Sequence, residues 1–384
     1  MIWREFFIFG AAVSVFHSRF RRGGELRSSR AAIPFNFQKC IMKNIFLFCF
    51  SVLTGILYAQ KPEIQTLLKD NISIRAIQIW DGKVWYAGTD SKFGYVSLKD
   101  TADQKQVSLS EKKLQFRTLA QDEQAFYAIN IESPAYFFRI DKRTLKAEIV
   151  NGDDSKNAFY DALYFHKHTF YTFSDPEADL ELKFAEFKMD NGTFYAKYYS
   201  DYLLNSGEAA FAASNTNIAA AKNYVWLATG GMSSRIFRLN TKNKDIEIFS
   251  TPFIQGTSSQ GIYSIDFYSK KFGIAVGGDY TKQAENFNNI ATTNDGGKTW
   301  QIQASGMNAG YKTCVKFRPG SKGKEIIAVG DQYIEFSGDY GQTWTIISEE
   351  KGLYVCEWID RDTVILAGKN RIVQMKLNER GFLK

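Results

Sequence analysis

Two stretches near the C-terminal end decide the fold: TNDGGKTW at residues 293–300 and SGDYGQTW at residues 337–344. They share the pattern Ser/Thr-x-Asp-x-Gly-x-Thr-Trp, and an apolar, strand-like segment lies on either side of each. The pattern predicts a hairpin turn in which the Asp accepts backbone N–H groups and the Gly supplies a positive φ. The Trp that ends each motif is expected to pack beneath its hairpin.

The segments before these turns repeat as well. An alternating strand, GIYSIDF at residues 261–267, leads to a short apolar strand, FGIAVGGD at residues 272–279, and residues 311–331 repeat the arrangement. Weaker copies begin near residues 74, 116, 160, 217 and 354. The chain therefore holds seven units of roughly 46 residues, the size of a four-stranded propeller blade.

These units predict an all-β fold, a seven-bladed β-propeller that occupies residues 60–384 as a single domain. The last unit has too little chain for a fourth strand, whereas residues 63–68, EIQTLL, have no unit of their own. We expect this N-terminal strand to complete the last blade. Such a pairing closes the ring and removes an open sheet edge.

The first 59 residues carry a different pattern. A short basic start at residues 42–44 precedes the apolar run IFLFCFSVLTGIL at residues 45–57, and Tyr58-Ala59-Gln60 follows. This order is typical of a signal peptide, so residues 42–59 are predicted to be removed after Ala59. Residues 1–41 are interpreted as a mis-called extension upstream of Met42. The expected product is secreted or periplasmic.

The charge of the chain argues against a nucleic-acid partner. The formal net charge is +7, but the segment ahead of Met42 holds most of the excess Lys and Arg. The rest of the chain is nearly neutral and offers no electrostatic footprint for nucleic acid. Two of the four cysteines also lie ahead of residue 60. The other two, Cys314 and Cys356, are expected to be buried small side chains, with a disulfide as the alternative.

Several further stretches run in an order known from one protein family: EAAFAASNTN at 208–217, VWLATGG at 225–231, SRIFR at 234–238 and AVGGDYTK at 275–282. With its two Asp boxes, as the turn motifs above are called, the chain resembles the BNR-repeat propellers of the photosystem II stability/assembly factor-like group over residues 60–377. The first four units depart from the pattern because their hairpins lack the Trp. The resemblance implies the propeller fold. It also implies a scaffold role, because members near photosystems are assembly chaperones that hold a membrane-protein subunit.

Polar residues that lie where inner strands begin, or where second strands end, are expected to converge on one mouth of the central channel. The alternative is that they cap turns. Glu208 and Arg235 attract most interest, because a charge in an apolar stretch needs a partner. The predicted ligand or partner site comprises Asp175, Asn215, Thr216, Arg235, Ser258, Asp279, Tyr280 and Asp331. The predicted structural set of the Asp boxes comprises Asp295, Gly297, Trp300, Asp339, Gly341 and Trp344.

The sequence contains few motifs that would indicate catalysis or metal binding. His166 and His168 share one face of a strand and could hold a divalent ion only with a third ligand. Bacterial relatives are often labelled oxidoreductase, yet the chain has no Gly-x-Gly-x-x-Gly after a strand and no P-loop. A sialidase would need an Arg trio and a Tyr nucleophile, and the usual Phe/Tyr-Arg-Ile-Pro start is missing. No cofactor or metal is predicted.

The sequence thus favours a non-catalytic scaffold, expected to be a monomer, that binds a protein or a surface polymer at the channel mouth. The alternative is a sialidase-like glycoside hydrolase that cleaves glycans. A pair of carboxylates facing each other across the channel would favour the hydrolase.

Overall fold

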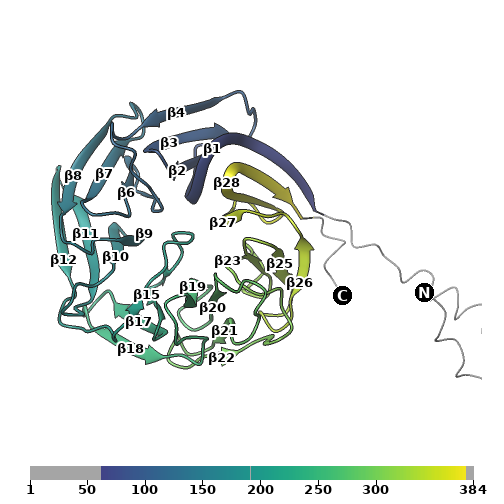
Figure 1. Cartoon of the computed structure of the whole chain (residues 1–384). Coiled ribbons are helices and arrows are strands. Elements are labelled where there is room, and N and C mark those ends of the chain that lie inside the picture. The colour runs from purple at the N-terminus through teal and green to yellow at the C-terminus, as the bar shows by residue number, and fades with distance from the viewer. Residues whose placement is uncertain (1–61, 191, 378–384) are drawn as a thin grey trace, which may run out of the picture. The chain divides into compact units, whose positions relative to one another are not determined.

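The computed structural model describes residues 62–190 and 192–377, and this part of the chain consists of strands and turns without a helix. The strands form sheets that follow one another around a ring in chain order (Figure 1). The predicted extension, 1–41, and the predicted signal peptide, 42–59, lie outside the described residues. In the described ranges no helix is long and apolar enough to cross a membrane.

Four of the sheets have four antiparallel strands each. One contains β5 (Ala120–Gln121), β6 (Ala125–Ile129), β7 (Ala135–Asp141) and β8 (Ala147–Asp153); the next contains β9 (Tyr160–His166), β10 (Thr169–Ser174), β11 (Lys183–Asp190) and β12 (Thr193–Tyr198). The third contains β14 (Ile218–Ala221), β15 (Tyr224–Ala228), β17 (Arg235–Asn240) and β18 (Ile246–Ser250); the fourth contains β23 (Cys314–Phe317), β24 (Ile326–Val329), β25 (Ile334–Ser337) and β26 (Thr345–Ser348).

Two sheets have six strands. One contains β13 (Glu208–Ala209), β16 (Gly230–Gly231), β19 (Gln260–Phe267), β20 (Gly273–Asp279), β21 (Ile290–Thr293) and β22 (Gln301–Ile302). The other contains β27 (Leu353–Trp358), β28 (Thr363–Lys376), β1 (Glu63–Trp80), β2 (Lys83–Gly88), β3 (Lys92–Ser97) and β4 (Gln104–Ser108).

The structure therefore has six blades, and the prediction of seven is wrong. The first and last predicted units do not form separate sheets, because β1 is one strand of 18 residues that serves both. Its first part pairs with β28 from Glu63↔Lys376 to Ser73↔Lys369, and its second part pairs with β2. The two units thus share backbone hydrogen bonds and become one six-stranded sheet.

The N-terminal strand nevertheless pairs with the last strand, as residues 63–68 were expected to do. Ile64 faces Met375 and Thr66 faces Val373 in this ladder. Leu67 and Leu68 are buried in the same apolar cluster as Ile372 and Val373. The ring is therefore closed by strand pairing and by burial of the side chains that this pairing brings together.

The segment 210–217, which we call the crossing segment, contacts strands of sheets far apart in the sequence. Asn215 accepts a hydrogen bond from Leu163 N at 2.7 Å and donates one to Leu119 O at 2.8 Å. Ser214 Oγ donates to Thr313 O, and Thr216 Oγ1 donates to Ser264 Oγ at 2.7 Å. The crossing segment thus ties β5, β9, β19 and the start of β23 together from inside the ring.

The two predicted Asp-box turns have the same internal bonds. Asp295 Oδ1 accepts the backbone N–H groups of Lys298 and Thr299, and Asp339 Oδ1 accepts that of Thr343. The indole N–H of Trp300 donates to Gly297 O at 3.0 Å, and that of Trp344 donates to Gly341 O at 2.9 Å. Gly297 and Gly341 have φ values of 86° and 85°, which a side chain would strain.

Candidate functional site

The innermost strands of the sheets, among them the second part of β1, β9, β19, β23 and β27, begin at one face of the ring. Two arginines lie near these beginnings, Arg75 in β1 and Arg117 just before β5. We call this side the arginine face. The Asp-box turns, which follow β21 and β25, lie at the opposite ends of the strands.

Arg75 and Arg117 both hold the crossing segment. Arg75 Nη1 donates to Ala213 O at 2.9 Å, and Arg117 Nη1 donates to Ala212 O at 3.4 Å. The Arg75 guanidinium also lies 4.1 Å from the centroid of the Tyr354 ring, a cation–π contact. Burial, and then the positive charge of Arg75, hold the pKa of Arg117 below its usual value.

Neither arginine forms an ion pair with any carboxylate in the part of the chain that the structure describes. Each guanidinium has five N–H donors, and a single hydrogen bond engages each group here. Both side chains are half-buried. The charges of Asp161 and Glu132 act on Arg117 without forming an ion pair with it. Two adjacent, partly desolvated cations without a direct carboxylate contact make this mouth attractive to an anion.

A buried carboxyl pair lies beneath the same segment. Asp161 in β9 is 0% exposed, and the nearby groups that favour its charged form are the Arg117 guanidinium and the backbone N–H of Ala212. Burial and the nearby charge of Asp175 raise the pKa of Asp161 well above its usual value. Burial raises the pKa of Asp175 to about 7. Ionisation of both carboxyl groups would place two negative charges close together in a buried environment, which is energetically unfavourable. The pair is therefore expected to retain a proton near neutral pH.

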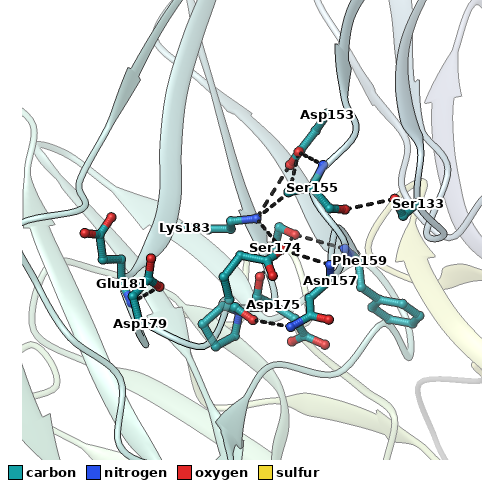
Figure 2. A network of polar contacts seen from close by, with 12 residues as sticks. Ser133, Asp153, Ser155, Asn157, Phe159, Ser174, Asp175, Asp179, Glu181 and Lys183 are labelled. Carbon is teal, nitrogen blue, oxygen red and sulfur yellow. Dashed lines mark hydrogen bonds and ion pairs between the residues drawn. The ribbon is translucent and has the colours of Figure 1, made fainter.

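Figure 2 shows Asp175 among the polar side chains that follow β8 and β10. Its backbone N–H donates to Phe159 O at 3.1 Å. Beside it, Lys183 Nζ lies 2.7 Å from Ser155 Oγ, 3.4 Å from Glu177 Oε1 and 3.9 Å from Asp153 Oδ2. Lys183 is thus already neutralised by two other carboxylates, which explains why Asp175 keeps a raised pKa so close to a cation.

Four of the predicted site residues act as braces or as a turn cap inside the chain. Asn215 and Thr216 belong to the crossing segment and are 8% exposed each. Asp279 Oδ1 accepts Thr281 N at 2.9 Å and Thr281 Oγ1 at 2.6 Å, which is a turn cap. The fourth, Arg235, donates through Nε to both carboxylate oxygens of Glu208 at 3.0 and 2.9 Å. The partner that Glu208 and Arg235 were expected to need is therefore each other.

Three further predicted residues lie on or near the arginine face and are more open, whereas Asp175 belongs to the buried carboxyl pair described above. Asp331 is half-buried, and its Oδ2 accepts a hydrogen bond from Gln283 at 3.3 Å. Ser258 is exposed, and Tyr280 is 51% exposed. The predicted set therefore splits between internal braces and a rim that faces outward.

A cavity of about 340 Å³ opens at the other end of the channel. Its polar lining includes Gln78, Gln121, Asp266, Lys316 and Glu357, and the crossing segment forms part of its wall. Lys316 Nζ pairs with Glu357 Oε2 at 2.7 Å. Asp266 accepts the backbone N–H of Phe317 at 2.9 Å. The charged groups of this cavity thus already have partners in the chain.

His166 and His168 belong to no metal-ligand cluster in the part of the chain that the structure describes. His166 Nε2 lies 2.9 Å from Lys222 O, on the face opposite the arginines. Among the residues that the structure describes, no group of three or more His, Cys, Asp or Glu side chains could hold a metal ion.

Comparison with known proteins supports the fold. No family model matches the chain, and no curated protein does. Among solved structures, the chain is similar to "YCF48 bound to D1 peptide", with a TM-score of 0.60 and 12% identity over 84% of this chain and 97% of that one. It is also similar to the WD40 repeats of RRP9, with a TM-score of 0.58 and 10% identity over 83% and 99% of the two chains. The structure of U3-55K gives a TM-score of 0.58 at 10% identity, over 82% and 98%. The chain is therefore a β-propeller of the general type that these proteins share.

Three residues at the centre of the arginine face were not among the predicted site residues: Arg75, Arg117 and Asp161. A signal was present, because each is a charged residue within an otherwise apolar inner strand or just before one, as in IRAIQI at 74–79 and FRTLA at 116–120. Like Glu208 and Arg235, each of these charged residues needs a partner because it lies in or beside an apolar stretch.

Proposed function

We propose that this protein is a scaffold that binds a protein partner on its arginine face, with a carboxylate of the partner seated against Arg75 and Arg117. The observation that carries the proposal is the pair of half-buried guanidinium groups, neither of which forms an ion pair with a carboxylate of the described residues. A partly desolvated cation is costly unless it is paired. A chain terminus or an acidic side chain supplies the planar, two-oxygen group that arginine binds best.

The rim of the same face offers apolar contact area. Tyr280, Phe287 and Met307, which lie in the long connections after β20 and β22, are 51%, 64% and 78% exposed. Aromatic and Met side chains, together with Arg, are enriched at protein–protein interfaces. A partner that seats its carboxylate centrally could bury these side chains around it.

The structural neighbours support a protein partner by analogy. One of them is described as bound to a D1 peptide, so a propeller of this general type can hold a peptide. At 12% identity the likeness concerns the fold, and the arginines argue for the site.

The carboxyl groups give less support to the glycan-cleaving alternative. Asp161 is fully buried, and Asp175 follows the neighbouring strand of the same sheet, so the two do not face each other across the channel. In the cavity at the other end, Asp266 and Glu357 are engaged by a backbone N–H and by Lys316. A glycosidase needs one carboxyl group free to give a proton and another free to attack or to activate water.

Export to a secreted or periplasmic location belongs to the same proposal, supported by the apolar run at 45–57 and by Tyr58-Ala59-Gln60. A partner would then be an envelope or extracellular protein.

Site-specific photo-crosslinking in the native host tests which face binds. A benzophenone amino acid in place of Tyr280 should give a discrete crosslinked protein. The same group in place of Gln342, in an Asp-box turn on the opposite face, should not. Equal crosslinking from both positions, or product from Gln342 alone, would contradict the assignment of the face.

A further inference from the structure

Two cysteines meet at the boundary between two sheets. Cys314 is the first residue of β23, and Cys356 lies in β27, the innermost strand of the next sheet in the ring. Their Sγ atoms are 3.7 Å apart, and both residues are 0% exposed. We propose that Cys314 and Cys356 are a covalent modification site, an intramolecular disulfide that forms as the two strands dock.

The geometry brings the two thiols together in an apolar environment. They belong to one apolar cluster with Ile327, Val355 and Leu366. Cys314 Sγ has Cys356 as its only hydrogen-bonding partner among the described residues, through Cys356 Sγ and through Cys356 O at 3.8 Å. A disulfide bond is about 2.05 Å long, so the sulfurs must approach by roughly 1.7 Å, a movement that two side chains can share.

The electrostatic surroundings divide the roles of the two thiols. Burial opposes a thiolate at Cys314, but the Cys356 thiol and Lys316 outweigh it and hold the pKa of Cys314 below its usual value. Burial raises the pKa of Cys356 well above its usual value. Cys314 is therefore the better first nucleophile, because the thiolate is the reactive form.

The reaction needs a disulfide-bearing oxidant, and its atoms balance in two exchanges. The Cys314 thiolate attacks one sulfur of the oxidant, which forms a mixed disulfide and releases one thiolate of the oxidant. Cys356 then loses its proton and attacks Cys314 Sγ, which releases the second half of the oxidant. The protein loses two protons and two electrons, and the oxidant is reduced to two thiols.

The burial of both sulfurs indicates at which stage of folding the disulfide forms and how it affects the folded ring. Neither sulfur is reachable in the folded ring, and the lowered pKa of Cys314 depends on its contact with Cys356, so oxidation occurs while β23 docks against β27. Once formed, the bond is shielded from reductants. It joins β23 to the sheet that contains both β1 and β28, and so fastens the ring beside the closure made by the N-terminal strand.

Peptide mapping of the full chain tests the proposal. The chain is unfolded, refolded in a buffer of glutathione and glutathione disulfide, unfolded again with iodoacetamide and digested with trypsin. Residues 313–316 carry Cys314 and residues 352–361 carry Cys356, on peptides distinct from those of Cys40 and Cys49. We expect these two peptides to be joined, with a mass two hydrogens below their sum, and to separate on reduction.

Alkylated Cys314 and Cys356, glutathione adducts at either residue, or links to Cys40 or Cys49 in place of this pair would overturn the proposal. A second measurement distinguishes stabilisation by the disulfide bond from stabilisation by side-chain packing. The oxidised chain should melt at a higher temperature than the same chain refolded with excess dithiothreitol, and Cys314→Ser should abolish the difference. A difference that persists in Cys314→Ser would show that another thiol causes it.

Discussion

Glu208 and Arg235 form an ion pair in which Arg235 Nε lies 3.0 and 2.9 Å from the two carboxylate oxygens. Glu208 is 2% exposed and also accepts hydrogen bonds from Asn205 N and Thr229 Oγ1. The pair stands where β13 joins β16, immediately before the crossing segment leaves for the centre of the ring. It therefore anchors the start of the element that braces the channel.

Arg235→Ala should destabilise the fold, because it leaves the buried Glu208 carboxylate without its counter-charge. Removal of one partner of a buried pair costs about 3 to 5 kcal/mol. Urea denaturation of the two chains measures the loss. Arg143→Ala is a matched control, because Arg143 is exposed and its side chain forms no ion pair within the described ranges. Midpoints that agree for Arg235→Ala and the unchanged chain would show that the ion pair contributes nothing.

Trp300→Ala should lower the free energy of unfolding about as much as Arg235→Ala does, but for another reason. Trp300 is 9% exposed, packs in one cluster with Trp226 and Phe267, and ties its turn through Gly297 O. Truncation of such a side chain leaves a cavity and costs about 3 to 5 kcal/mol. Trp344→Ala should behave alike, since its turn has the same bonds. Thermal unfolding provides the comparison, and a Tm unchanged in both variants would argue against a stapling role for these turns.

The acid pair beneath the crossing segment predicts a pH dependence with a definite sign. Asp175 has a folded-state pKa of about 7 against an ordinary value of 3.8, so between these values the folded chain binds the extra proton. This stabilisation is complete below pH 3.8 and is lost as the pH rises through 7. Each pH unit within the window removes about 1.4 kcal/mol for each such group.

Denaturation of the unchanged chain and of Asp175→Asn from pH 4 to pH 8 isolates this contribution. The unchanged chain should lose stability relative to Asp175→Asn as the pH rises, because the amide cannot ionise. Curves that run parallel across the range would show that Asp175 is not perturbed. Asp179→Asn is the control, because Asp179 is an exposed acid in the same connection.

The features that depend on a local sequence pattern could be predicted from the sequence. The two turn motifs gave the hairpins at 293–300 and 337–344, and the unmatched strand at 63–68 gave the pairing with β28. The predicted number of blades was wrong because each sequence repeat was assigned its own sheet. In the structure, β1 pairs with both β28 and β2 and so joins the last repeat and the first repeat in one sheet. No sequence motif between the two halves of β1 indicates that they form one continuous strand.

The site was harder to predict because its contacts join distant parts of the chain. Asn215 bonds to Leu119, which lies 96 residues earlier, and Arg75 bonds to Ala213, which lies 138 residues later. A local pattern identifies such residues as polar and does not say what they meet. The pattern thus predicts Asn215 and Thr216 as polar site residues, and the structure adds their hydrogen bonds to neighbouring strands.

The most direct test of the arginine face combines crosslinking at Tyr280 with the double substitution Arg75→Gln and Arg117→Gln. Loss of a paired charge at an interface costs about 2 to 5 kcal/mol, so the yield of crosslinked partner at limiting concentration should fall by about 30-fold or more. Arg143→Gln, which removes an exposed arginine from the opposite face, should leave the yield unchanged. A Tm of the double variant close to that of the unchanged chain would assign the loss to binding. Undiminished crosslinking by a folded double variant would contradict the account.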